Sequence, residues 1–309
     1  MPRDFDDLML GSLELFCLAA EHESFTQAAQ LAGLNPTAVS RTIARLEARL
    51  GAKLFVRSTR SVQLTDSGRA YFEQCRKALD LLRDAEQRTA SAQAAPSGLI
   101  RLSMATAYAH YRVLPLLPKF RRQFPKVGFE LHLSNRNVDF TAEPFDLAIR
   151  GRTPPDSSLI ARKLEDAELV LVGAPAYLAR AGLPRSISEL AAHDCLQFLL
   201  PSTGQSIPWL FRVDGEDVQL DTPASYRCAE DYLGPVTLAR QGAGLLQTYR
   251  FIVQEDLGQG RLVELLPETG GRSRPFSLIY PNREHTPLRV RAFIDFLADE
   301  IPSNSARHA

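Results

Sequence analysis

Positive charge gathers in one segment of this sequence. Between Ser24 and Arg60 there are six Lys or Arg residues and one acidic residue, a local net charge of +5, although the 309-residue chain balances 36 basic against 36 acidic residues. Arg41, Arg45 and Arg49 are spaced four apart, so they share one face of a helix. The positive electrostatic field of such a segment attracts phosphate groups. The same spacing is also typical of an ordinary solvated helix face, so the interpretation depends on the surrounding elements.

Other chemistry has little support in the sequence. The six histidines show no metal-ligand spacing, and we find no Gly-rich phosphate loop or nucleophile elbow. The four cysteines are scattered without a C-x-x-C pair, which indicates buried thiols in a reducing compartment and not a disulfide framework or a zinc site. We therefore expect no catalytic residue, no metal and no cofactor. The acidic N-terminus lacks a secretory pattern and no long apolar run is present, so we expect a cytoplasmic protein without a membrane partner.

Local signals around the basic cluster predict two helices joined by a tight turn. Ser24 with Gln27 forms a capping-box arrangement, and Gly33 suits a left-handed helix end. Asn35 and Pro36 are favoured at the cap and first position of the next helix, which Gly51 ends. This is the pattern of a helix-turn-helix motif.

After this helix the spacing of the apolar residues changes from a helical to a strand-like one. Two short strand-like runs, "KLFVR" and "SVQLT", predict a small hairpin, or wing, that carries Arg57 and Arg60. Thr65 can cap a long helix extending to about Ala92. Its apolar residues recur every three or four positions and predict a face that is buried against a second copy of the chain. The interface residues expected there are Phe72, Leu79 and Leu82.

At these motifs the sequence resembles a known family. The segments "SFTQAA", "AVSRTIARLE", "LGAKLFVR" and "LTDSG" are similar to the winged helix-turn-helix of LysR-type transcriptional regulators. One departure affects base recognition: many members have Gln then Pro at the start of the recognition helix, whereas here the pair is Pro36-Thr37. Glu47 is expected to pack or pair within the protein. The predicted DNA-contacting residues are Pro36, Thr37, Ser40, Arg41, Arg45, Arg57 and Arg60.

A domain boundary is expected near residue 95. The helical pattern fades into small residues, Pro96-Ser97-Gly98 interrupts it, and strand-like runs then alternate with helices as in α/β proteins with largely parallel sheets. We predict a winged helix-turn-helix at 1–65, a linker helix at 66–95 and a regulatory domain at 96–309. The resemblance implies that this last domain is like a periplasmic binding protein. It would have subdomain I at about 97–164 and 270–301, and subdomain II at about 165–269.

Candidate ligand-binding residues lie where predicted strands end. A strand ends near Ser103 and a helix begins near Thr106, where free N–H groups favour anions, although Thr106 could equally serve only as a cap. By position, the resemblance makes Thr106 an effector-contacting hydroxyl. Arg150 and Arg152 follow another strand and could bind a carboxylate or form surface ion pairs. Ser202 and Thr203 could bind a ligand or merely form a turn.

The leading hypothesis is a sequence-specific DNA-binding transcription regulator that responds to a small-molecule effector, of which a carboxylate is the favoured class. Its expected partners are double-stranded promoter DNA, further copies of itself (a homodimer, and by resemblance a homotetramer) and RNA polymerase. Two other classes stay open at this stage. One is a solute-binding or metabolic α/β protein with an accessory DNA-binding head, and the other is an architectural nucleic-acid binder without a ligand.

Overall fold

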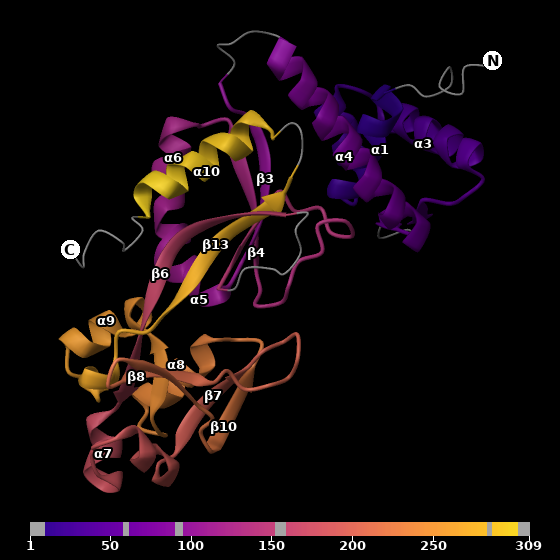
Figure 1. The fold of residues 1–309 in the computed structure, drawn as a ribbon. Coiled ribbons are helices and arrows are strands. Elements are labelled where there is room, and N and C mark those ends of the chain that lie inside the picture. Colours follow the sequence, from indigo (N-terminus) through magenta and orange to yellow (C-terminus); the bar gives the residue numbers. More distant parts are fainter. Residues whose placement is uncertain (1–9, 58–61, 90–94, 152–158, 283–285, 302–309) are drawn as a thin grey trace. The chain divides into compact units, whose positions relative to one another are not determined.

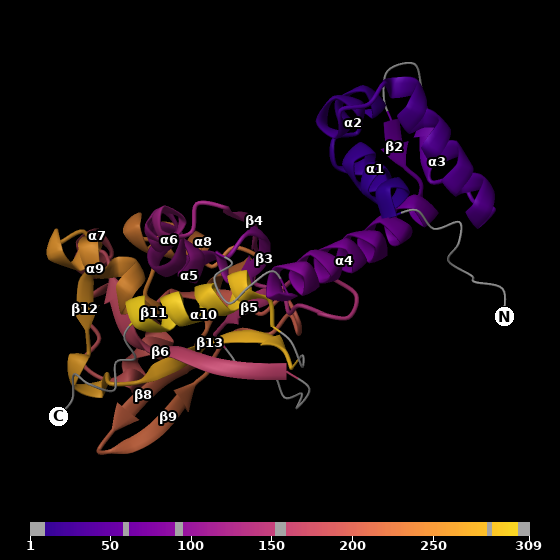
Figure 2. The same ribbon diagram turned by 90° about the horizontal axis from the view of Figure 1, so that it is seen from above.

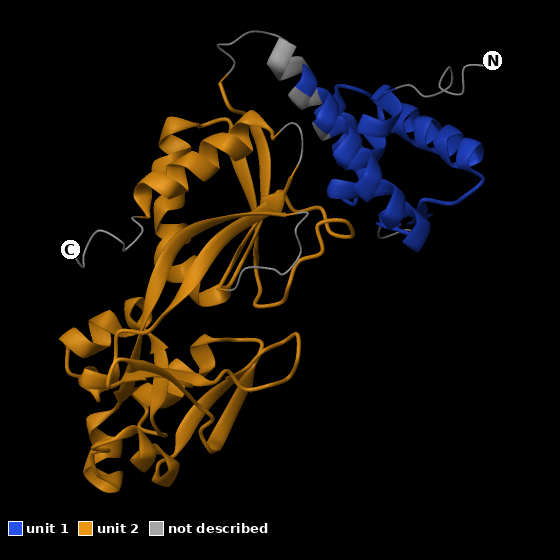
Figure 3. Cartoon of the chain, viewed as in Figure 1, with its two compact units in different colours: residues 1–94 blue, residues 95–309 orange. Residues whose placement is uncertain are grey.

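The computed structural model describes residues 10–57, 62–89, 95–151, 159–282 and 286–301, and the chain divides into two compact units (Figure 3). The first unit comprises Met1–Ala94 and the second Ala95–Ala309. This division lies beside the boundary expected near residue 95.

The first unit is a winged helix-turn-helix. It contains α1 (Leu10–Glu21), α2 (Phe25–Ala32), α3 (Pro36–Leu50), the antiparallel strands β1 (Phe55–Arg57) and β2 (Val62–Leu64), and α4 (Asp66–Thr89). Figure 2 shows α1, α2 and α3 gathered beside β2. The expected end of the long helix at Ala92 lies outside the described residues.

The predicted caps at the ends of α2 and α3 are present in this unit. The side chains of Ser24 and Asn35 accept hydrogen bonds from the N–H groups of Gln27 (3.2 Å) and Ala38 (2.8 Å). Gly33 and Gly51 adopt left-handed conformations with φ of 67° and 63°. These local bonds satisfy helix-end groups that would otherwise have no partner, so they fix the angle at which α3 leaves α2.

A core of apolar side chains holds α1, α3 and the wing together. Phe16 lies at its centre, with ring centroids 5.5 Å from Phe55 and 6.3 Å from Phe72, both in edge-to-face geometry. Leu13, Ile43 and Leu54 are buried in the same cluster. The core therefore fixes α3 relative to the wing, two elements that in this class of domain contact DNA.

The second unit is built on a mixed seven-stranded sheet with the order β11-β6-β13-β5-β3-β4, and β12 also pairs with β6. Its strands are β3 (Gly98–Met104), β4 (Val127–Leu133), β5 (Leu147–Arg150), β6 (Leu159–Gly173), β11 (Leu246–Tyr249), β12 (Val263–Leu265) and β13 (Ser273–Pro281). Only β3, β4 and β5 are mutually parallel, whereas β6, β11, β12 and β13 pair antiparallel. The expectation of largely parallel sheets is therefore wrong, because periodicity does not reveal strand direction.

Two long strands connect the halves of this unit. Figure 1 shows β6 and β13 running side by side from the half with β3, β4 and α10 (Leu288–Glu300) to the half with β7 (Cys195–Leu199), β8 (Trp209–Val213) and β10 (Ala224–Ala229). The register of the pair shifts between Phe276 and Ser277. The sequence-based subdomain limits fall inside β6 and just before β13.

Helices cover the sheet, and a hairpin completes the second half. A continuous helical segment comprises α5 (Thr106–Tyr108), a π-helical turn (Ala109–Val113), a 3-10 turn (Leu114–Leu116) and α6 (Leu117–Gln123). The other helices are α7 (Pro175–Ala181), α8 (Leu233–Arg240) and α9 (Arg250–Gly258), with short 3-10 turns at Ile187–Ala192 and Pro267–Thr269. Strand β8 pairs antiparallel with β9 (Glu216–Leu220), and β7 pairs parallel with β10. The β8–β9 hairpin and α9 were not predicted from the sequence.

Gly68 gives a direct test of the packing of α4 against the wing. A Cβ atom at Gly68 would overlap the backbone carbonyl of Leu54, which cannot move without displacing β1. We expect Gly68→Ala to destabilise the first unit by about 1–3 kcal/mol, the usual effect of overpacking. Hydrogen exchange measured by mass spectrometry on peptides from α1 to α3 checks this. In Gly11→Ala, the control, the new Cβ meets nothing within 4 Å, and equal protection in both variants would contradict the packing.

Candidate DNA-binding face and effector cavity

The first turns of α3 present a polar, basic surface. Pro36, Thr37, Arg41 and Arg45 are exposed, whereas Val39, Ile43 and Leu46 are buried in the core of the unit. Ser40 lies at the margin and is half-buried. Because the apolar residues fix one side of α3 to the core, the opposite side is free to contact a ligand.

Other basic residues of this segment lie at the end of α3 and in the wing. Arg49 donates a hydrogen bond to the hydroxyl of Tyr71 on α4 at 3.4 Å, so it does not act as a simple extension of the row that contains Arg41 and Arg45. The backbone of Arg57 pairs with Val62 in the wing. Arg60 lies outside the described residues.

Glu47 explains how one acidic residue is accommodated within this basic segment. Its carboxylate is 3% exposed and accepts hydrogen bonds from the amides of Leu54 (3.0 Å) and Phe55 (3.2 Å) and from Lys53 Nζ (2.8 Å). Burial acts to raise the pKa of Glu47, but these hydrogen bonds outweigh it and lower the pKa below its usual value. Glu47 therefore links α3 to the wing and does not face DNA, as expected from the sequence.

The residues predicted for the dimer interface on the linker helix differ in their exposure. Phe72 and Leu79 are half-buried against the core of their own unit, where the ring of Phe72 lies edge-to-face with Phe16 on α1. Leu82 is exposed, and so is its neighbour Leu81, which is 64% exposed and is not among the predicted interface residues. Ala78, Leu81, Leu82 and Ala85 are all exposed at helical spacing, and this set is called the linker stripe below.

A cavity of about 780 Å³ lies between the two halves of the second unit. One side comes from the ends of β3 and β5 and from the loop after β4, and the other comes from β7, the start of α8 and the end of β11. The crossing strand β13 also contributes. The lining includes Tyr108, Asn135, Asp139, Arg150, Phe198, Ser202, Tyr232, Tyr249, Arg274 and Phe276. This volume is in the range of small-molecule sites.

Arg150 is the principal charged group of the cavity. It is 8% exposed, and it donates hydrogen bonds to the carbonyl oxygens of Arg136 and Ile149, each at 2.9 Å, and to Ser103 Oγ at 2.7 Å. Within the described part of the chain, no carboxylate forms an ion pair with it. Burial lowers the pKa of Arg150 to about 10, against a raising effect from Glu143. The guanidinium is still charged at neutral pH, so the cavity contains a buried cation that favours an anion.

Two predicted residues do not face this cavity. Ser103 is 2% exposed within β3, where its hydroxyl holds Arg150. Thr106 begins α5 as expected, but it is not among the residues that line the cavity. Asn135, which does line it, accepts a bond from the Thr106 amide at 3.3 Å and donates to the Thr106 hydroxyl at 3.5 Å. The amide and the hydroxyl of Thr106 are therefore already bonded within the protein.

Of the remaining predicted ligand-binding residues, one lines the cavity and another does not. Ser202 lines the cavity, whereas Thr203 is exposed and its hydroxyl accepts from the Gln205 amide within a turn. Arg152 lies outside the described residues. Asn135, Phe198 and Tyr249 were missed although each lies at or just after the carboxyl end of a strand, the same signal that identified Arg150. Arg274 and Phe276 carry no such signal, because they lie on a crossing strand.

Contacts beside the cavity connect its two halves. Asn135 Nδ2 donates to the carbonyl of Glu230 at 2.7 Å, and Arg136 forms an ion pair with the Glu230 carboxylate at 3.3 Å. Glu230 is a non-glycine residue with φ of 65°. These bonds join the loop after β4 to the loop after β10. A ligand that touches both sides of the cavity would therefore affect the distance between the same two loops.

Comparison with known proteins agrees with this two-unit organisation. Residues 10–69 match the family model of the bacterial regulatory helix-turn-helix protein, lysR family, and residues 93–302 match that of the LysR substrate binding domain. The chain belongs to the LysR family. It is an effector-responsive, DNA-binding transcription regulator and not an enzyme.

Similarity to individual LysR-type proteins extends over nearly the whole chain. It is 32% identical to the HTH-type transcriptional regulator CrgA of Neisseria meningitidis over 94% of this chain and 97% of the relative. It is 34% identical to the regulator PtxR of Pseudomonas aeruginosa over 95% and 93%. Among solved structures, CrgA aligns with a TM-score of 0.61 at 30% identity, covering 95% of this chain and 99% of CrgA. The full-length Vibrio cholerae virulence activator AphB aligns at 0.59 and 27%, covering 96% and 100%.

Two kinds of feature are absent from the described residues of this LysR-type chain. Its described residues contain no group of three or more His, Cys, Asp or Glu side chains placed to hold a metal ion. Among the same residues, no helix has both the length and the apolar character required to cross a membrane.

The buried Glu47 predicts a pH-dependent stability of the LysR-type head. Because the folded pKa is below the unfolded one, the stabilisation is fully present above the usual pKa of 4.5 and is lost as pH falls through the folded value. We expect Glu47→Gln to lower the free energy of unfolding by about 1–3 kcal/mol at neutral pH, with a smaller difference in acid. Calorimetric unfolding across that range measures it. Lys53→Met removes only an exposed ion-pair partner and should change stability by less than about 1 kcal/mol; a difference for Glu47→Gln that is independent of pH would contradict this account.

Proposed function

We propose that this regulator reads promoter DNA through the first turns of α3 and changes its binding when a small anionic effector enters the cavity of the second unit. The observation that carries the effector proposal is the buried Arg150, which lines the cavity without a carboxylate partner among the described residues. A carboxylate ligand would neutralise this charge and form strong charge-assisted hydrogen bonds.

On the DNA side, Thr37, Ser40 and Arg41 are proposed to face base edges, since they lie in the first two turns of α3. Arg45, Arg57 and Arg60 are proposed to contact phosphates, and Pro36 to set the start of the helix. Exposure of Thr37, Arg41 and Arg45 beside a fixed apolar face supports this assignment.

We further propose that the protein acts as a homodimer in the cytoplasm and that two dimers form a homotetramer on DNA. The exposed linker stripe supports the dimer, because leucines exposed in a row on one helix gain free energy when buried against a second copy. A contact with RNA polymerase would complete a regulatory role at promoters.

Arg41 tests the DNA-reading assignment. Selection of bound genomic fragments with the full chain should yield a shared sequence, and Arg41→Ala should weaken binding to that sequence by about 1–3 kcal/mol while binding to random DNA changes less. Arg49→Ala is the control on the same helix, because Arg49 bonds to Tyr71. Equal loss on specific and random DNA for Arg41→Ala would make it a phosphate contact instead.

Leu81 tests the linker stripe. Leu81→Asp would place a charge in the proposed dimer seam, which costs several kcal/mol when the charge is desolvated and unpaired. We expect sedimentation to show monomers at micromolar concentration and weak promoter binding. Leu183 has the same 64% exposure outside the linker, so Leu183→Asp should leave assembly unchanged. A dimeric Leu81→Asp protein would place the main interface elsewhere.

Arg150 tests the effector proposal. Arg150→Gln retains a polar side chain but removes the charge, so a bound carboxylate loses interactions worth about 1.5–3 kcal/mol. The effector concentration that gives a half-maximal change in promoter binding should rise about 10-fold or more, while binding without effector stays the same. An unchanged response would move the anion site away from Arg150.

A further inference from the structure

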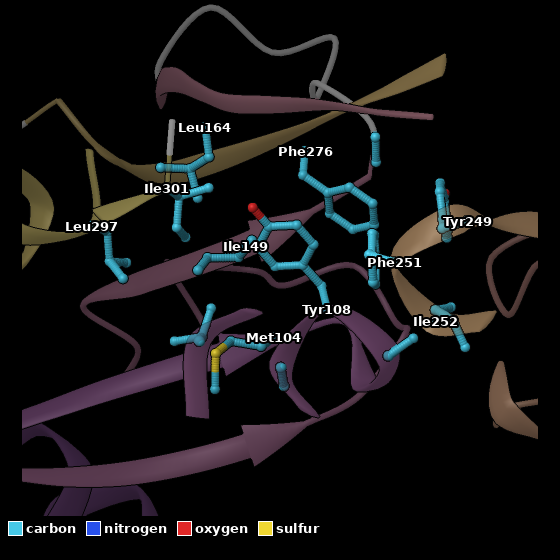
Figure 4. Packing of buried hydrophobic residues seen from close by; sticks show 14 of the residues in the cluster. Met104, Tyr108, Ile149, Leu164, Tyr249, Phe251, Ile252, Phe276, Leu297 and Ile301 are labelled. Carbon is cyan, nitrogen blue, oxygen red and sulfur yellow. The ribbon is translucent and has the colours of Figure 1, made fainter. Parts of the chain in front are cut away.

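The cavity walls are unusually rich in aromatic side chains. Six of the lining residues are Phe or Tyr, and several of them form one continuous chain of ring contacts. Tyr108 stacks on Phe276 at 4.1 Å between ring centroids, and Figure 4 shows these two rings side by side with Tyr249 beyond them. Tyr249 lies edge-to-face with Phe276 at 5.1 Å and is 5.4 Å from Tyr232, which in turn is 5.1 Å from Phe198. We call these five residues the aromatic wall.

The aromatic wall adjoins the buried cation. A Cβ at Gly151, the residue after Arg150, would lie 3.4 Å from the ring of Phe276 and 3.5 Å from the Tyr249 hydroxyl oxygen. Of the five N–H groups of Arg150, three donate to described residues, one on each nitrogen. Among the described residues, each terminal nitrogen therefore keeps one N–H, which can serve a carboxylate oxygen.

Two other polar side chains of the cavity already form hydrogen bonds within the protein. Asn135 bonds with Thr106 and with the Glu230 carbonyl. Oδ1 of Asp139, the one acidic residue among the described lining residues, accepts from the amides of Thr141 and Ala142 and from the Thr141 hydroxyl. An acid held by Arg150 and by the aromatic wall needs neither of these side chains.

We propose that the effector is an aromatic carboxylate whose acid group is bound by Arg150 and whose ring packs against the aromatic wall. This inference rests on the proposed function of the cavity as an anion-binding effector site. An aromatic ring gains edge-to-face and offset contacts with the wall beyond the burial of its area, which a saturated ring of similar size does not.

Three matched probes separate the contributions of acid and ring. Isothermal titration of the full-length protein would use 3-phenylpropanoate, 3-cyclohexylpropanoate (the saturated acid) and 3-phenylpropanamide (the neutral aromatic). The flexible two-carbon spacer allows the ring to reach the wall while the acid group is at Arg150. We expect the saturated acid to bind roughly 2- to 10-fold more weakly and the amide roughly 10-fold or more weakly than 3-phenylpropanoate.

A pair of variants assigns the ring preference to the wall. Phe198→Leu should remove most of the difference between the aromatic and saturated acids. Phe211→Leu is the control, since Phe211 is also a buried aromatic residue but packs near Trp209 and does not line the cavity. A preference that is lost equally in both variants would contradict the role of the wall.

The outcomes distinguish the two levels of the proposal. Equal binding of the aromatic and saturated acids by the wild-type protein overturns the aromatic class but leaves the anion site intact. Binding of the amide as tight as that of the acid overturns Arg150 as the anchor. If neither acid binds at millimolar concentration, the anion-binding cavity itself is wrong, and with it the proposed effector class.

Discussion

A buried arginine without a carboxylate partner among the described residues is the constraint around which the second unit is organised. Arg150 ends β5 in the interior, and the protein holds its guanidinium with two carbonyl oxygens and the hydroxyl of Ser103. These acceptors satisfy three N–H groups but do not neutralise the charge. Because a buried charge is stabilised chiefly by an opposite charge, the arrangement favours the bound state of an anion. The parallel strands β3 and β5 bring the group to the edge of the sheet where the two halves meet.

The first unit also contains a buried charge, but there the protein itself supplies the partners. Glu47 is also buried and charged, but its amide and ammonium partners come from Leu54, Phe55 and Lys53 within the same unit. Its charge is therefore used to fix the wing relative to α3, and it needs no ligand. The contrast between Glu47 and Arg150 separates a structural charge from one that is available for binding.

Local signals in the sequence were sufficient for much of the fold. Ser24, Asn35, Gly33 and Gly51 act on neighbours within a few residues, so their roles in the helix-turn-helix could be predicted and are confirmed by the structure. Strand direction could not be predicted in the same way, because β6 and β13 pair across more than 100 residues.

The same limit explains why some predicted site residues lie away from the surfaces expected for them. The Thr106 hydroxyl is engaged by Asn135, which lies 29 residues away, and Phe72 packs on Phe16 from another helix. The place of Arg150 in the cavity could be predicted because a strand end is a local feature and its direction in the sheet follows a general rule. The aromatic wall assembles from five separate stretches of the chain, so it appears only when the fold is known.

The central claim is that an anion in the cavity is bound by Arg150, and nuclear magnetic resonance of arginine side chains tests it directly. In the full-length protein, the Nε–H signal of Arg150, assigned by its loss in Arg150→Gln, should shift saturably as 3-phenylpropanoate is added and stay in place with the amide. The signal of Arg274, the other arginine among the described lining residues, should move less. A saturable shift at Arg274 with no change at Arg150 would contradict the account.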